Sequence, residues 1–196
     1  MLAVSFLKLC LETVSNRRVV FAVLNALYFC FIFAAAFLSH YFLVLLPYEG
    51  GPVDVPDFLV GVDWSVMVVG IFLFNLTLSG FLFVTLPGLV FFPLSAAVLL
   101  FRGFLWGVLL SQLPTAYFLA ALPTVVLEGE GYVLASVAGI TLGLSWIKPN
   151  WVYGGEGLSR FGALRKALRE CGRSYVIVAI VLFVAAVVEI ITIAYL

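Results

Sequence analysis

Hydrophobic residues run along this chain in long stretches rather than in alternation with polar ones. A helix needs about 20 apolar residues to cross a bilayer core of about 30 Å. Four stretches meet that length, at residues 19–46, 65–86, 88–110 and 175–196. They are apolar on all sides, whereas the strands of membrane barrels alternate with a period of two. The pattern predicts an all-α, polytopic transmembrane bundle that forms one domain over residues 1–196.

The middle of the chain departs from this simple pattern. Residues 113–127 are bounded by Pro114, are interrupted by Pro123 and would reach only about 22 Å as a helix. We therefore expect a re-entrant half-helix there, a break at residues 128–131, and a returning span at 131–147. The prediction amounts to about five spans and one half-helix.

Two less apolar segments have helical amphipathic patterns. Residues 1–16 and residues 159–172, within the segment 148–174, are expected to lie on the membrane surface as interfacial helices. Gly172 would end the second of these helices. The apolar positions expected to face the membrane are Val4, Leu7, Leu11 and Val14 in the first, and Phe161, Leu164, Leu168 and Cys171 in the second.

Composition and charge agree with a membrane protein and suggest its orientation. The mean hydropathy is +1.24, and 10% of the residues are charged. Basic residues gather before the first span and at 148–174, while the loop 47–64 carries Glu49, Asp54, Asp57 and Asp63 and no base. Because cytoplasmic ends collect Lys and Arg, we expect a cell-membrane protein with the N-terminus and 148–174 inside, and the acidic loop and C-terminus outside.

The same charges indicate which partners to expect. The inner basic segment, from Arg160 to Arg173, could bind anionic lipid of the inner leaflet, or it could be a solvated connector that fixes topology. A homo-oligomer or another membrane protein remains open as a partner. The formal net charge of zero argues against nucleic acid.

The chain offers little catalytic chemistry. It has one histidine, His40, and three isolated cysteines, with no C-x-x-C pair and no glycine loop of the phosphate-binding type. These counts predict a protein that is not an enzyme and that has no cofactor and no metal site.

The informative residues are polar groups placed within the apolar stretches. A charge at the bilayer centre costs about 2.5–3.5 kcal/mol, so each needs a partner or a cavity. At a helix break, Glu128 and Glu130 could turn toward one cavity, and Arg102 is the expected ion-pair partner of one of them. The predicted buried polar or ion site consists of Asn75, Arg102, Glu128, Glu130 and Glu189.

Small residues recur at intervals of four in two of the predicted helices. Gly103 and Gly107 form one pair, and Ala135, Gly139 and Gly143 form a longer stripe. Such spacing lets helix backbones approach closely in a membrane. We expect close packing of the helices that carry Arg102 and the glutamates, with a subunit interface as the alternative.

These features together resemble a known family. The motifs FLFN at 72–75, Pro87-Gly88, FRGFLWG at 101–107 and LPTVVLEGEGYVLASVAGITLG at 122–143 are similar to those of the stage II sporulation protein M family of integral membrane proteins, including archaeal members. The resemblance points to Asn75, Gly103, Gly107, Pro123, Glu128, Gly139 and Gly143. The chain differs from the family pattern at Arg102, where the family has Asn, and at Thr124 and Val125, where it has His-Gly.

The resemblance implies a non-enzymatic membrane protein, because the family's namesake is a scaffold that recruits cell-wall-degrading partners during spore engulfment. It therefore slightly favours a scaffold or assembly subunit. The alternative is an ion- or proton-coupled transporter or channel, which the carboxylates beside the expected helix break support. The two differ in whether the carboxylates line a wet cavity or form a dry pair with Arg102.

Overall fold

The computed structural model describes residues 2–42 and 61–195, which form helices joined by short turns and include no strand. The all-α class is thus confirmed. Most of the acidic loop, including Glu49, Asp54 and Asp57, lies outside the described residues. The elements are α1 (Leu2–Ser15), α2 (Arg18–Phe42), α3 (Trp64–Leu73), η2 (Phe74–Thr85), α4 (Leu86–Val90), α5 (Phe92–Gln112), α6 (Thr115–Ile147), α7 (Pro149–Tyr153) and α8 (Arg160–Tyr195).

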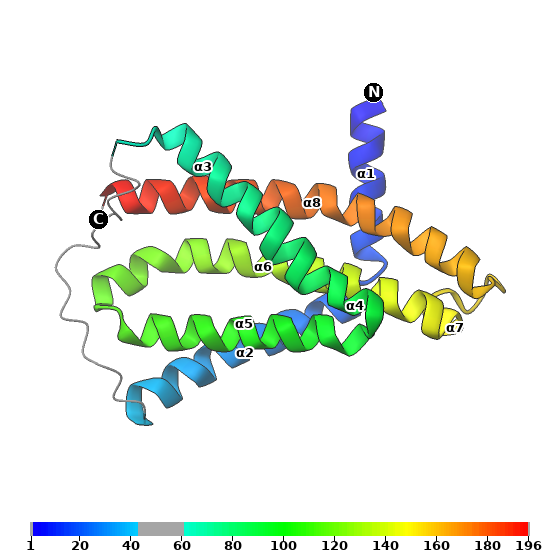
Figure 1. Ribbon diagram of the computed structural model, residues 1–196, viewed down its shortest axis with the longest axis horizontal. Helices are drawn as coiled ribbons and strands as arrows, with labels where there is room; N and C mark the ends of the chain where they lie inside the picture. The colour runs from blue at the N-terminus through cyan, green and yellow to red at the C-terminus, as the bar shows by residue number, and fades with distance from the viewer. Residues whose placement is uncertain (1, 43–60, 196) are drawn as a thin grey trace.

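Within residues 2–42 and 61–195, five helical runs are long and apolar enough to cross a membrane: α2, the continuous run α3–η2–α4, α5, α6 and α8. In Figure 1, α5, α6 and α8 follow the long axis of the molecule, α2 and the run from α3 to α4 are inclined to it, and α1 stands nearly at right angles. This architecture confirms a multi-pass helical membrane protein.

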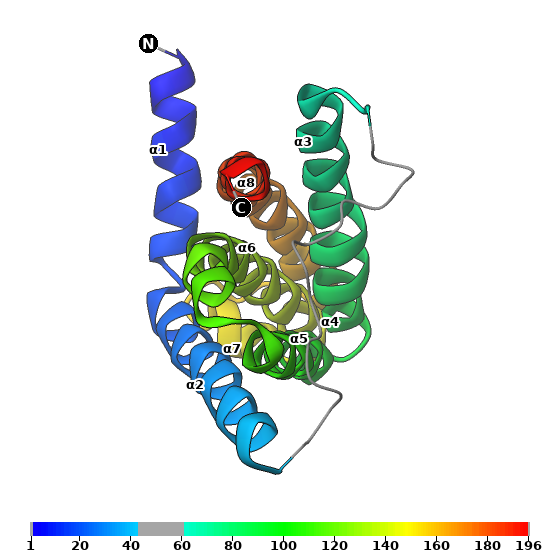
Figure 2. The ribbon, with the colours of Figure 1, turned by 90° about the vertical axis from the view of Figure 1, so that its left-hand side faces the viewer.

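Helix α6 is the centre of the bundle. It packs against α2, η2, α4, α5 and α8, and Figure 2 shows it enclosed by the other helices. In its most apolar window 78% of the residues are buried, against 17–28% in the other four spans. Those outer spans instead present apolar side chains such as Phe33, Phe83 and Phe101 on the outside of the bundle, where lipid can cover them.

The expected half-helix is not a separate element. Residues 115–127 are the first turns of α6, which continues through Glu128 and Gly131 to Ile147, so the predicted break at 128–131 is absent. Pro123 lies inside the helix. It is the ninth residue of α6, so it removes one amide hydrogen bond of the ladder without ending it. Neighbouring helices make such a proline tolerable within a membrane bundle.

The second span contains a wide helix that the apolar pattern does not predict. Residues Phe74–Thr85 form the π-helix η2, whose hydrogen bonds reach back five residues, as in the bond from the Leu86 amide to the Phe81 carbonyl. Its buried residues recur about every five positions: Asn75, then Ser79 and Gly80, then Val84 and Thr85. Helices of this kind are rare and are often found at functional sites.

Of the two predicted interfacial helices, one is a separate helix and the other is part of a longer one. Helix α1 exists, and it packs against α8 through the buried residues Cys10 and Thr13, while Val4, Leu7 and Leu11 are exposed. The second is not separate, because α8 passes through Gly172 without a break. Its buried face at this end is Ala163, Ala167 and Cys171, whereas Phe161 and Leu168 are exposed. Because α8 has 36 residues and spans about 54 Å, it outreaches the bilayer core.

An ion pair ties three elements together at the end of the bundle that carries most of the Lys and Arg residues, here called the basic end. Arg17, between α1 and α2, lies 3.3 Å from Glu170 of α8, and the Tyr153 hydroxyl of α7 donates to the same carboxylate at 2.8 Å. Burial, followed by this hydrogen bond, raises the pKa of Tyr153. The contacts hold the connection from α7 to α8 against α1.

Candidate functional site: a charged cavity within the bundle

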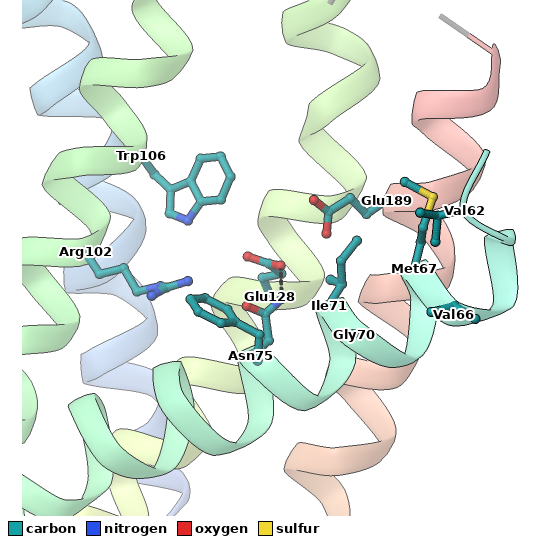
Figure 3. Close-up of a pocket in the computed structure, with 11 residues that line it drawn as sticks. Val62, Val66, Met67, Gly70, Ile71, Asn75, Arg102, Trp106, Glu128 and Glu189 are labelled. Atoms are coloured by element: carbon teal, nitrogen blue, oxygen red, sulfur yellow. Dashed lines mark hydrogen bonds between the residues drawn. The ribbon is translucent and has the colours of Figure 1, made fainter. Parts of the chain in front are cut away.

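The central feature of the site is a contact between a carboxylate of α6 and an amide of η2. The Asn75 amide nitrogen donates a hydrogen bond to Glu128, and the exposed fractions of the two residues are 5% and 4%. The π-helix directs Asn75 toward α6, and Figure 3 shows the two side chains meeting. A neutral amide can satisfy one lone pair of the carboxylate but cannot balance its charge.

Arg102 does not form the predicted ion pair. Among the described residues, no Arg102 nitrogen lies within 4.0 Å of a glutamate oxygen. Its guanidinium instead donates to the Tyr132 hydroxyl at 2.7 Å and lies over the Tyr132 ring, 3.9 Å from the centroid. The preference has a physical basis, because one aromatic side chain supplies both an acceptor and a π-face. The Nε atom of Arg102 is buried without a hydrogen-bond partner.

Glu128, Arg102 and Glu189 line a single cavity of about 530 Å³. Glu189 reaches it from α8, and its Oε2 atom is buried without a hydrogen-bond partner. Apolar walls come from α3 and α5 and include Met67, Ile71 and Trp106 (Figure 3). The lining begins at Val62, just before α3, so the cavity extends from that end of the bundle inward to Glu128.

Glu130 is not part of this cavity, contrary to the expectation that both glutamates face one site. Both of its oxygens accept from the amide of Asn25 on α2, at 2.8 and 2.7 Å. The reason is that α6 is unbroken. Residues two apart on a helix lie about 200° around the axis, so Glu128 faces η2 and α8 while Glu130 faces α2.

The small residues allow close packing, but the two stripes do not face each other. A Cβ on Gly103 would lie 3.0 Å from the Tyr28 ring of α2, and Gly107 packs against Ile32 and Ala35 of the same helix. On α6, a Cβ on Gly139 would lie 2.6 Å from the Ser95 hydroxyl and 2.8 Å from the Thr85 carbonyl oxygen, and Gly143 packs against Gly88 and Phe92. Ala135 is fully buried. The Gly103–Gly107 pair therefore allows α5 to pack closely on α2, and the stripe on α6 allows α6 to pack closely on η2, α4 and the start of α5.

Several polar contacts of the site were not predicted from the sequence. Asn25 and Tyr132 hold Glu130 and Arg102. A second group joins η2, α6 and α8, because Thr85 donates to the Ala135 carbonyl at 2.8 Å and lies 2.6 Å from the Tyr175 hydroxyl. Asn25 could have been predicted by the same pattern that indicated Asn75, namely an amide side chain within an apolar stretch. No comparable signal marks a tyrosine, which is common in such stretches.

The fold and the cavity define a class: a multi-pass helical membrane protein with a charged cavity among its spans. Within that class, the chain belongs to the stage II sporulation protein M family, whose model matches residues 25–192. Comparisons with curated proteins and with solved structures found no match. The family assignment predicted from the sequence motifs is confirmed. Two residues to which the motifs pointed, Asn75 and Glu128, are hydrogen-bonded to each other.

Proposed function

We propose that the protein is an ion- or proton-coupled transporter that binds a proton or small cation between Glu128 and Glu189. The observation that carries the proposal is that both carboxylates line one cavity of about 530 Å³ that also contains Arg102. Arg102 balances one of two negative charges, so a proton or bound cation is needed to neutralise the other. Ionisable groups within membrane spans commonly mark ion pathways.

Each residue then has a definite role. Glu128 is the deep ligand, and Asn75 orients its carboxylate through their hydrogen bond. Glu189, which has a buried oxygen without a hydrogen-bond partner, is the second ligand. Arg102 is held by Tyr132 and stays close enough to line the same cavity. Its charge limits how many cations the site can accept.

The test is flux measured in proteoliposomes together with unfolding midpoints in detergent. We expect Glu128→Gln and Glu189→Gln to abolish cation or proton flux and to change the midpoint little, because an amide replaces a group that a proton would neutralise anyway. The matched control is Glu130→Gln, on the same helix but facing Asn25, which should leave flux intact. Absence of flux in the parent protein, under both a proton gradient and monovalent-cation gradients, would refute the transporter proposal.

A scaffold or assembly subunit is the second candidate, and the contacts at the basic end favour it. The Arg17–Glu170 pair and the Tyr153 hydrogen bond fix α1, α7 and α8 relative to one another, which is suitable for presenting a constant surface to a partner. Under this proposal the buried charges only specify packing. A stable parent protein without flux, whose association with a membrane partner is lost in Arg17→Gln, would support the scaffold.

A further inference from the structure

A second cavity, of about 540 Å³, lies at the basic end and is separate from the carboxylate cavity. It is a groove between α4, α6 and α8, lined by Leu89, Val90, Trp146, Arg160, Phe161 and Leu164. Five of the six side chains are apolar, and the sixth is an arginine. We refer to it as the α4–α6–α8 groove.

The walls of the groove suit a hydrocarbon chain. Val90 and Phe161 have exposed fractions of 70% and 79%, which would be unfavourable in water for side chains of this size. They belong to elements that begin or end a membrane span. Hydrocarbon that covers them must therefore come from the bilayer or from a membrane-embedded partner.

Two polar features fix where the headgroup of a lipid would lie. Trp146 is held in place by a hydrogen bond of 2.7 Å from its indole nitrogen to the Leu89 carbonyl oxygen, and tryptophan favours the level of the lipid headgroups. Arg160 is exposed and lies in the first turn of α8. An arginine fork matches a phosphate group in geometry and charge.

We propose that the α4–α6–α8 groove is a binding site for an anionic phospholipid, with an acyl chain against Val90, Trp146 and Phe161 and the phosphate at Arg160. Charge complementarity decides between lipids. The surface of α8 near the groove also carries the exposed residues Arg165 and Arg169, so the local field favours a headgroup with a net negative charge over a zwitterionic one. The inference does not depend on the carboxylate cavity or on transport.

Trp146 can report occupancy directly. In a variant with Trp64, Trp106 and Trp151 replaced by Phe, Trp146 is the remaining tryptophan. Vesicles of neutral phosphatidylcholine would contain a small fraction of lipid brominated on the acyl chains, either phosphatidylglycerol or phosphatidylcholine, and bromine quenches indole fluorescence on contact. We expect the anionic lipid to quench Trp146 as if its local concentration were about fivefold higher than that of the neutral lipid.

Two arginine variants distinguish a specific lipid-binding site in the groove from general attraction of anionic lipid to the basic surface of α8. Arg160→Gln should remove the preference for phosphatidylglycerol, while Arg165→Gln, on the same helix but outside the groove lining, should retain most of it. Unchanged unfolding midpoints would show that both variants are folded. Equal quenching by the two brominated lipids in the parent, or equal losses in the two arginine variants, would overturn the proposal.

Discussion

The hydrogen bond between Asn75 and Glu128 joins two side chains that hydrocarbon could not solvate. Each is nearly fully buried, and each supplies what the other lacks, a donor for a carboxylate and an acceptor for an amide. The energetic importance of such a pair lies mainly in the penalty of leaving one member alone.

A double-mutant cycle measures this penalty. Asn75→Leu and Glu128→Met each leave one buried polar group without its partner and should each lower the free energy of unfolding by about 1–3 kcal/mol. The double variant removes both groups and should lose less than the sum of the two single losses. Reversible unfolding in detergent gives the three values. Strictly additive losses would mean that the two side chains do not stabilise each other.

The buried polar residues of the site could be predicted from the sequence, but the residues that they contact could not. Asn75, Arg102, Glu128 and Glu189 all line the cavity, because charged and amide groups inside apolar stretches are conspicuous. Their pairing depends on which helices meet and at what rotation, and spacing along the chain does not contain that information. Arg102 therefore donates a hydrogen bond to Tyr132 rather than pairing with a glutamate, and Glu130 accepts hydrogen bonds from Asn25.

At the scale of elements, apolar length predicted the number of spans but not their internal geometry. The π-helix η2 shows why. At about 100° per residue, Asn75 and Val84 would lie on opposite faces of an α-helix, yet both are buried. A search of the sequence for apolar residues at the α-helical spacing of 3.6 therefore cannot reveal the buried face of η2. The predicted break at residues 128–131 is absent for a related reason. A short apolar stretch and a proline indicated that a helix ends there, but α6 is continuous through both and packs against neighbouring helices on several sides.

The close approach of α6 to the turn between α4 and α5 depends on the absence of a side chain at Gly143. A Cβ there would overlap the Gly88 carbonyl oxygen and lie 3.0 Å from the Phe92 Cα. We expect Gly143→Ala to lower the free energy of unfolding by about 1–3 kcal/mol, as overpacking does. Gly70→Ala on α3 is the control, since a Cβ there meets nothing within 4 Å. That change should be neutral or stabilising by up to about 1 kcal/mol, and equal effects would contradict the packing described.

The start of α3 depends on an exposed cap whose strength varies with pH. Asp63 Oδ1 accepts a hydrogen bond from the Ser65 amide at 2.8 Å, and its hydrogen bonds from the Ser65 side chain and backbone lower the pKa of the Asp63 carboxyl. A lowered folded pKa means that the cap stabilises α3 above the usual aspartate pKa of about 3.9 and is lost as the pH falls below it.

Hydrogen exchange of a peptide covering residues 61–67 tests this dependence. Relative to Asp63→Asn, which can cap at every pH, the parent should lose protection only below about pH 4. A difference between the two proteins that stays constant from pH 3 to pH 7 would show that the ionised carboxylate does not hold the cap.

The five candidate spans among the described residues predict on which side of the membrane each connection lies. The described connections agree with the predicted parity, because α5 and α6 supply two crossings between α4 and α7. Basic residues gather at one end, with Arg17 and Glu170 in contact there. The orientation itself remains a prediction from the distribution of Lys and Arg.

Accessibility of single cysteines in a cysteine-free background would test the orientation. Cysteines at the exposed positions Glu12, Gly155 and Arg165 should react with a membrane-impermeant reagent only after the cytoplasmic side is opened. A cysteine at the exposed Gly61 should react in intact cells. Labelling of Arg165→Cys in intact cells would contradict the number of crossings if Glu12→Cys stays protected, and it would contradict the orientation if Glu12→Cys is labelled as well.

The enclosed position of α6 also has a consequence for how the chain enters the membrane during synthesis. Of the five spans, α6 has the lowest hydropathy, 1.4, and it carries two carboxylates. An isolated helix with such groups at its centre inserts poorly from the translocon. Glu130 and Glu128 accept hydrogen bonds from Asn25 and Asn75, respectively, and Arg102 lines the same cavity as Glu128. Asn25, Asn75 and Arg102 all precede α6 in the chain. The polar partners of both carboxylates are therefore synthesised before α6, whereas α8, which also packs on α6, follows it. The order of the chain thus provides these two buried charges with partners by the time α6 is inserted.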